Sequence, residues 1–299
     1  MDISDSNPFR QDPKVVIFDL CGTLMDSKKI DHDAINYTLS YYKKDCWEIT
    51  RLKKDKSKSM KENFPIFFGD QAQEAYNMYI NYLVDNMKDI HFFDDASAHL
   101  NLLKNYNIKT AIVTNRDSLF VSSLDSHQDF LTNIKPFIDT VVTADEAGVT
   151  KPSAKIIDYT LTKLSLSHLK SQQDVVFIRD AYADMQVAIN YPAIPILLTA
   201  TTADITEDFL KRNYANIYQA KSHKKILNSF KQFKERERMI RSFYSMSKKA
   251  KEINNFDKDS RGPEAQVNRS KSLEKINLIQ HKYTALDIVQ SLYQFKKRR

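Results

Sequence analysis

The stretch VVIFDLCGTLMDS, residues 15–27, runs from an apolar segment through an acidic residue into a tight turn. An unbroken apolar run is typical of a strand that is covered on both faces of a parallel sheet, and the pair Gly22-Thr23 then turns the chain. Asp19 is therefore expected at the carboxyl end of a buried strand, where open α/β sheets bind their ligands.

Four further apolar runs rich in β-branched residues follow, at 109–115, 140–143, 174–180 and 194–199. The segments between the runs can form helices, and strands that alternate with helices indicate a parallel sheet. The sequence thus predicts an α/β fold with a Rossmann-like parallel sheet.

The chain of 299 residues is long enough for more than one compact region. We expect an α/β core formed by residues 1–27 and 91–220, because the first two strands lie too far apart for one crossover. Apolar residues at helical spacing predict that the insert, residues 28–90, is a helical cap. The polar stretch 51–63 within it is expected to be a loop or a frayed helix end.

Residues 221–299 are predicted to be a helical extension. Ile226, Phe230, Phe233 and Ile240 share one face of a first helix, and a second helix is expected over residues 276–293. The polar segment 254–272, which contains Gly262-Pro263, separates the two helices.

Charge is distributed unevenly along the chain. Residues 221–299 contain 21 Lys and Arg against 8 Asp and Glu, a net charge of +13, whereas residues 1–220 carry a net charge of −6. A basic segment of this kind favours an anionic partner, either a nucleic acid or a membrane surface, or docking onto the acidic body. A solvated helical face explains the same charge without a partner, and both interpretations stay open.

Several classes of protein do not fit the sequence. No apolar run approaches the roughly 20 residues that span a bilayer, and the N-terminal stretch MDISDSNPFRQDPK does not resemble a secretory signal. Two cysteines, Cys21 and Cys46, cannot form a disulfide framework, and no histidine pairs with a cysteine at zinc-ligand spacing. We therefore expect a cytoplasmic protein without a transmembrane segment.

The carboxyl ends of the predicted strands collect polar residues with a common chemistry. Besides Asp19, they are Thr23, Thr114, Asn115, Lys151, Asp180 and Asp184, the last two being one helical turn apart. Carboxylates that lie close together repel unless a cation joins them, and their oxygen ligands suit Mg²⁺. A hydroxyl and an ammonium group beside them suit the oxygens of a phosphoryl group, which a carboxylate can attack.

The order Asp-x-x-Gly-Thr, Thr-Asn, Lys-Pro and Asp-x-x-x-Asp, each after its own predicted strand, resembles the haloacid dehalogenase superfamily. The resemblance covers roughly residues 14–220, and the insert 28–90 stands where the family has its helical cap. Most members are Mg²⁺-dependent phosphatases. The resemblance therefore implies a hydrolase that acts on a small phosphorylated compound.

The resemblance also implies which residues bind the substrate and which react with it. Asp19 would be the nucleophile and would form an aspartyl-phosphate. Thr23, Thr114 and Lys151 would hold the phosphoryl group, with Thr114 and Lys151 also counted as catalytic. Asn115 would orient the nucleophile loop or the substrate, and Pro152, directly after the lysine, is well placed to open a helix.

A Mg²⁺ site is implied by the same resemblance. Asp19 and Asp180 would be direct ligands, Cys21 would contribute its backbone carbonyl, and Asp184 would support the metal shell. Arg179 departs from the family, which usually has glycine at this position. Its side chain is expected either to strengthen phosphate binding or to pair with Asp184 and disturb the metal site.

Cys21 is the second departure from the family pattern. In the family's phosphatases a second aspartate stands at this position, where it protonates the leaving oxygen and then activates water. The resemblance therefore counts Cys21 among the catalytic residues. A thiol with a pKa near 8.5 is a poor substitute, and loss of a positioned acid/base typically costs about 10²–10⁴ in rate.

Three interpretations of Cys21 follow. The protein hydrolyses a substrate whose leaving group needs little protonation, or Asp19 is phosphorylated and turns over slowly. In the third, the site binds without catalysis, and the chain is an interaction protein that acts through its basic extension.

Overall fold

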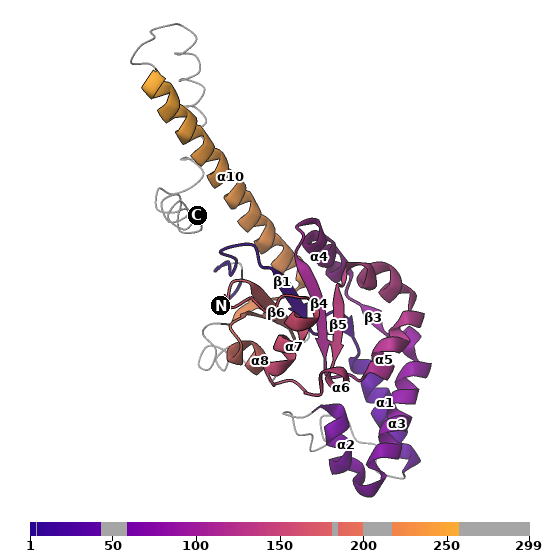
Figure 1. Ribbon diagram of the computed structural model, residues 1–299. Coiled ribbons are helices and arrows are strands. Elements are labelled where there is room, and N and C mark those ends of the chain that lie inside the picture. The colour runs from indigo at the N-terminus through magenta and orange to yellow at the C-terminus, as the bar shows by residue number, and fades with distance from the viewer. Residues whose placement is uncertain (4, 43–58, 181–184, 200–216, 257–299) are drawn as a thin grey trace. The chain divides into compact units, whose positions relative to one another are not determined.

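The structure is a computed structural model that describes residues 1–3, 5–42, 59–180, 185–199 and 217–256 (Figure 1). The chain divides into two compact units, residues 1–229 and 230–299. The sheet and the candidate site belong to the first unit. The boundaries predicted for the core, the cap and the extension stay a prediction.

Parallel strands form the main sheet of the first unit, in the order β5-β4-β1-β6-β7-β8 over the described residues. Their bounds are Val15–Phe18 (β1), Lys109–Thr114 (β4), Thr140–Thr143 (β5), Val175–Arg179 (β6), Ile194–Leu198 (β7) and Tyr218–Ala220 (β8). The predicted Rossmann-like sheet is confirmed, and each of the five predicted runs contains a strand. β8 was not predicted because its sequence, YQA, contains no apolar run.

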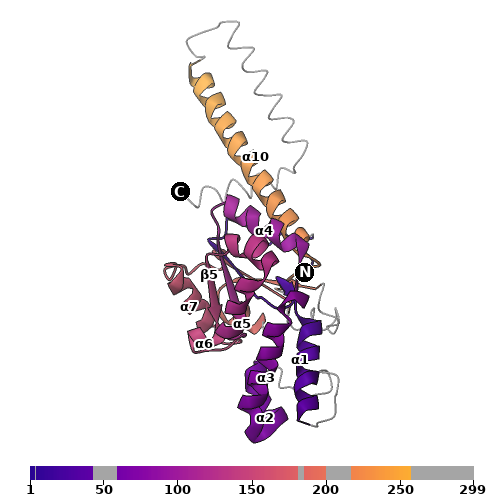
Figure 2. The same ribbon diagram turned by 90° about the vertical axis from the view of Figure 1, so that its right-hand side faces the viewer.

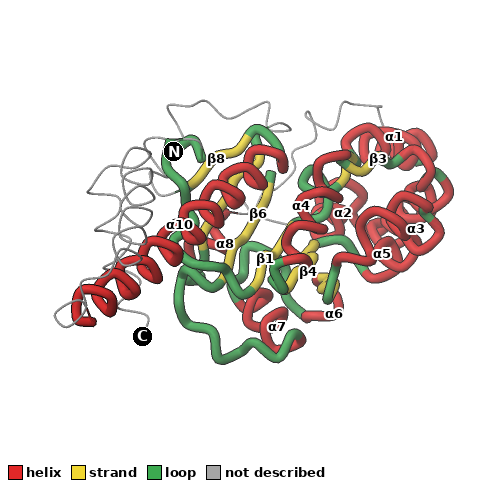
Figure 3. Tube along the Cα trace, turned by 90° about the horizontal axis from the view of Figure 1, so that it is seen from above, coloured by secondary structure: helices red, strands yellow, loops and turns green. Residues whose placement is uncertain are grey.

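The two faces of the sheet are covered by different helices (Figure 3). Ile17 and Phe177 belong to a buried cluster with Ile157 of α7 (Lys155–Lys163) and Val187 of α8 (Met185–Asn190). On the opposite face, Phe18 makes an edge contact with His99 of α4 (Asp94–Asn105), their ring centroids 5.5 Å apart. Because both faces are buried, the strands are continuous apolar runs rather than alternating ones.

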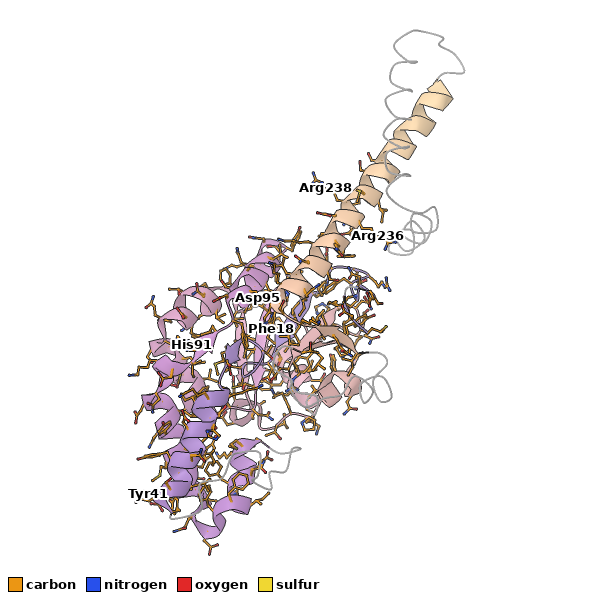
Figure 4. The ribbon with its side chains drawn as sticks, turned by 180° about the vertical axis from the view of Figure 1, so that it is seen from behind. Phe18, Tyr41, His91, Asp95, Arg236 and Arg238 are labelled. Atoms are coloured by element: carbon orange, nitrogen blue, oxygen red, sulfur yellow. The ribbon has the colours of Figure 1, made fainter. Side chains whose placement is uncertain are left out.

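Helices fill the described part of the insert between β1 and β4. They are α1 (Lys28–Tyr41), α2 (Met60–Phe68) and α3 (Ala72–Asp85), with short helical turns at Gly69–Gln71 and Met87–Asp89. They lie together away from the main sheet (Figures 1 and 2). Figure 4 shows Tyr41, at the end of α1, far from Phe18 in the sheet. The strands β2 (Met25–Asp26) and β3 (His91–Phe92) pair antiparallel where the insert leaves and rejoins the core.

Two local predictions need correction. Residues 60–63 were expected in a loop or a frayed helix end, but they begin α2, because Ser59 and Glu62 form a capping box at its start. Pro152 was expected to open a helix, whereas α7 begins at Lys155 and Pro152 lies in the preceding turn.

The remaining elements connect the strands or follow the sheet. They are α4 (Asp94–Asn105), α5 (Ser118–Ser123), α6 (Ala144–Ala147), α7 (Lys155–Lys163), α8 (Met185–Asn190) and α10 (His223–Phe256), with short turns at Leu124–Ser126, Phe130–Ile134 and Lys135–Phe137. The second helix predicted over residues 276–293 lies outside the described residues. Within the described ranges, no helix is both long enough and apolar enough to span a membrane.

Candidate active site

Asp19 lies directly after β1, in the middle of the sheet, and its carboxyl group is buried. The parallel register aligns Phe18 with Ile112 of β4 and with Ile178 of β6. The carboxyl ends of the three strands therefore meet around Asp19. This agrees with the expectation that the residues after these strands lie at one edge of the sheet.

The two oxygens of the Asp19 carboxylate have different partners. Oδ1 accepts hydrogen bonds from Lys151 Nζ at 2.6 Å and from the backbone N–H of Leu20 at 2.8 Å. Oδ2 accepts one from Arg179 Nη2 at 3.2 Å. Burial alone would raise the pKa of Asp19, but the charges of Lys151 and Arg179 outweigh it, so the pKa lies below its usual value. Asp19 is therefore a carboxylate at neutral pH.

Lys151 is buried, and both its backbone and its ammonium group are held in place. Its Nζ also donates to the carbonyl of Val113 at 3.1 Å. Asn115 donates to the Lys151 carbonyl and accepts from the Lys151 N–H, at 3.2 and 2.9 Å. Burial and the neighbouring Arg179 lower the pKa of Lys151 to about 8, which leaves the ammonium charged at neutral pH.

The turn after Asp19 packs closely against Asp180. Gly22 has a φ of +75°, and a Cβ at this position would come within 1.9 Å of Asp180 Oδ2. Thr23 is buried and its hydroxyl donates to Asp180 Oδ1 at 3.4 Å. Burial and the charge of Asp19 raise the pKa of Asp180 to about 6. The glycine of the motif is thus required both by its backbone conformation and by the carboxyl group beside it.

Cys21 faces an arginine that the sequence analysis did not single out. Arg116 Nε donates to Cys21 Sγ at 3.2 Å, and the Arg116 N–H donates to the hydroxyl of Thr114 at 3.1 Å. Burial raises the pKa of Cys21 even though the charge of Arg116 opposes it. Cys21 is therefore a thiol at neutral pH and cannot take a proton from water.

Arg116 also joins the core to the insert. Its Nη2 contacts both oxygens of Asp31 in α1 at 2.5 Å, and its Nη1 donates to the hydroxyl of Tyr79 in α3 at 2.8 Å. Tyr79 in turn donates to Asp31 at 2.6 Å. Arg116 could have been identified as a site residue from the sequence because it directly follows the Thr114-Asn115 motif. Nothing in the sequence, however, links it to Asp31, 85 positions away.

The described residues do not fit a Mg²⁺ ion at Asp19. An ion bound to Oδ2 at the usual distance of about 2.1 Å would lie within roughly 5 Å of the Arg179 nitrogen, because that nitrogen is 3.2 Å from Oδ2. The two positive charges would repel by several kcal/mol. Over the described ranges, no group of three or more His, Cys, Asp or Glu could hold a metal. Asp184, which was predicted to support the metal shell, lies outside those ranges, and the predicted contribution of the Cys21 carbonyl stays a prediction.

The structure therefore brings most of the predicted site residues together. Asp19, Cys21, Thr23, Thr114, Asn115, Lys151 and Asp180 all lie at or beside the carboxyl ends of β1, β4 and β6. Arg179 pairs with Asp19. Its expected pairing with Asp184 lies outside the described residues, and its expected role in phosphate binding stays a prediction.

Comparison with known proteins agrees with this architecture. The profile of the haloacid dehalogenase-like hydrolases matches residues 16–193, and the chain belongs to that family. This confirms the resemblance seen in the sequence. No curated protein matches the chain.

Two solved structures illustrate the similarity of fold. A predicted phosphatase from Clostridium acetobutylicum is 24% identical, with a TM-score of 0.57 over 73% of this chain and 100% of the phosphatase. CbbY from Rhodobacter sphaeroides, in complex with phosphate, is 17% identical, with a TM-score of 0.59 over 71% of this chain and 95% of CbbY.

Proposed function

We propose that this chain hydrolyses a small phosphorylated compound through an aspartyl-phosphate on Asp19. The observation that carries the proposal is the buried, ionised Asp19 at the carboxyl edge of the sheet, with Lys151 Nζ 2.6 Å from its carboxylate. A nucleophile needs to be charged and positioned, and its electrophile needs a neighbouring cation.

The contacts of Asp19 suggest which oxygen attacks. Oδ1 is held by two short hydrogen bonds, from Lys151 and from the Leu20 N–H, whereas Oδ2 has the longer contact with Arg179. We therefore assign the attack to Oδ2. A bond forms between Oδ2 and phosphorus, the bond to the leaving oxygen breaks, and its electron pair departs with that oxygen. The ammonium of Lys151 then stabilises the charge on the phosphoryl oxygens.

Cys21 limits both halves of this reaction. A buried thiol with a raised pKa is a weak acid for the leaving oxygen and no base for water. The first step then favours substrates whose leaving groups depart without a proton. The second step, the attack of water on the aspartyl-phosphate, has no assigned base, so the aspartyl-phosphate is expected to accumulate.

Mg²⁺ is the cation that the family resemblance implies for such a site. When bound, it would supply positive charge to the phosphoryl oxygens. Because the donors described around Asp19 do not fit the ion, the steps above use only groups of this chain.

An alternative function is favoured by Cys21 and by the contact between Arg179 and Asp19. In this second proposal the chain binds phosphate without turning it over, and its basic residues 221–299, with a net charge of +13, contact a partner. An anionic partner, either a nucleic acid or a membrane surface, is the candidate that this charge suggests.

The experiment compares para-nitrophenyl phosphate and acetyl phosphate as substrates, because both have leaving groups that need little protonation. We expect the wild type to release product and its intact mass to increase by one phosphoryl group. Asp19→Asn is expected to abolish both signals, whereas Cys21→Asp is expected to raise the rate about 10-fold to 100-fold by restoring an acid/base.

The matched control is Asp125→Asn, because Asp125 is an exposed aspartate whose partner, Lys135, lies on the surface. It should leave both signals unchanged. If neither product nor adduct forms with the wild type and with Cys21→Asp, the hydrolase proposal is wrong and the binding alternative replaces it.

A further inference from the structure

Arg179 is the most deeply buried cation beside Asp19. Its side chain is fully buried, although it is among the largest in the protein. It stands at the end of β6, and its guanidinium carbon lies 5.0 Å from the centre of the Phe177 ring, two residues earlier on the same face of the strand. The guanidinium is therefore held between an aromatic ring and the carboxylate of Asp19.

A buried guanidinium at this position is not explained by packing alone. Burying a charge is costly unless a partner of opposite charge compensates for it; one such partner here is Asp19 Oδ2 at 3.2 Å, and the charge of Asp180 also stabilises the guanidinium. Burial lowers the pKa of Arg179 to about 10, so the group still carries its charge at neutral pH. The side chain thus brings a permanent positive charge to the oxygen that we assign as the nucleophile.

The charge on Asp19 changes when it accepts a phosphoryl group. The carboxylate becomes a neutral acyl group, and the negative charge then resides on the phosphoryl oxygens. Lys151 and Arg179, which face the carboxylate beforehand, then face those oxygens. Guanidinium suits this change of partner because its five N–H donors match phosphate as well as carboxylate geometry.

We infer that the guanidinium of Arg179 supplies the positive charge for which a divalent cation is expected, so that this site binds a phosphate dianion without metal. The inference deepens the proposed function and rests on it for turnover. Phosphate binding, however, can be measured whether or not the chain turns over substrate. The ligand class is a phosphoryl dianion, and inorganic phosphate is the probe.

Two binding measurements on the full chain test the inference. Calorimetry follows the binding of inorganic phosphate with EDTA and, separately, with Mg²⁺. Electron paramagnetic resonance follows the binding of Mn²⁺ as a stand-in for Mg²⁺. For the wild type we expect phosphate affinities that agree within about twofold under both conditions, and no Mn²⁺ bound at stoichiometric level.

Arg179→Gly provides the second arm, because it restores the residue that the family usually has. Phosphate affinity in EDTA should fall about 10-fold to 100-fold, the value of one charge-assisted hydrogen bond. One Mn²⁺ per chain should then bind, and Mg²⁺ should recover part of the phosphate affinity. Arg10→Gly, which removes an exposed arginine of the same unit, is the control and should behave as the wild type. Arg179→Gln replaces the glycine variant if the latter does not fold, with the same loss of phosphate affinity expected.

The wild type alone can overturn the inference. A wild-type chain that binds Mn²⁺ stoichiometrically and loses phosphate in EDTA contradicts it, and so does one that binds no phosphate under either condition. If phosphate binds without metal but no adduct or product forms, the inference stands and the hydrolase proposal fails. If product forms only with Mg²⁺, and phosphate binding needs the metal too, the hydrolase proposal stands and the inference fails.

Discussion

Two aspartates of the first unit, the buried Asp19 and the partly buried Asp31, have carboxylates in contrasting surroundings. Among the described residues, Asp19 faces two cations, Lys151 and Arg179, and none of the three groups comes from the insert. Asp31 faces one, Arg116, and this pair connects α1 to the loop after β4. The first carboxylate is in direct contact with two cations, and Asp180, whose pKa is about 6, adds a second negative charge to that cluster. The second carboxylate is paired with a single cation.

The difference suggests separate roles for the two clusters. A balanced pair attracts no further ion and stabilises the contact between the insert and the core. When a carboxylate that contacts two cations is phosphorylated, the negative charge resides on the phosphoryl oxygens. Both cations can then pair with those oxygens instead of with the carboxylate. Each role can be tested by removing one cation and measuring a different quantity.

The largest effect on stability is expected from Arg116→Met. It leaves Asp31, whose side chain is 20% exposed, without its cation, and we expect this to cost about 1–3 kcal/mol of the free energy of unfolding, less than a fully buried pair would. Urea unfolding measures the loss, and adding Asp31→Asn should recover part of it, because no unpaired charge then remains. If the double variant is as unstable as the sum of the two single variants, the pair does not act as a unit.

Lys151→Met tests the other cluster through activity. Without the ammonium, Arg179 is the one cation described beside Asp19 that still faces the phosphoryl oxygens, and the rate of para-nitrophenyl phosphate hydrolysis should fall about 10²-fold to 10³-fold. Lys163→Met is the control, because that lysine pairs with Glu146 at the surface. An unchanged rate in Lys151→Met would remove this residue from the proposed reaction.

A smaller effect is expected from a third buried cluster, which consists of neutral groups. His223 Nε2 lies 2.7 Å from the carbonyl of Thr23, and its Nδ1 lies 3.1 Å from Nδ1 of His99. Since a carbonyl only accepts, His223 Nε2 must donate to it, and in the neutral pair His99 donates to His223. Burial lowers the pKa of both histidines, most strongly that of His99.

The sign of the pH dependence follows from these lowered values. The unfolded chain takes up protons first as the pH falls below about 6.5, so stability is complete above that pH and decreases below it. Each histidine contributes at most about 1.4 kcal/mol per pH unit. Urea unfolding at pH 7.5 and 5.5, values on either side of about 6.5, should show a smaller decrease in His99→Gln than in the wild type. The exposed control His168→Gln should show the wild-type decrease, and an equal decrease in all three would contradict the assignment.

The parts of the fold that were predicted correctly are those encoded locally. An apolar run such as Val15–Phe18 is recognisable because a strand buried on both faces needs apolar residues at every position. β8 was missed because a three-residue edge strand has no such pattern. The start of α2 was missed for a different reason, since its Ser59–Glu62 capping box is a sequence signal that was available.

The residues of the candidate site likewise fall into those that could be predicted from the sequence and those that could not. Asp19, Thr114 and Lys151 could be chosen from sequence because each follows a predicted strand, and parallel strands direct their carboxyl ends to one edge. The roles assigned to these residues stay predictions. The Arg116 cluster could not be chosen, because its members come from three elements whose contact depends on how the insert packs against the core.

The sequence by itself determined the class of fold, the family and the identity of the charged groups at the sheet edge. Only the tertiary structure decided which of those charges face one another. Arg179 was visible as a departure from the family pattern, but its contact with Asp19 joins residues 160 positions apart. Such a contact depends on the register of β1 against β6 and on the direction of a long side chain, neither of which local sequence specifies.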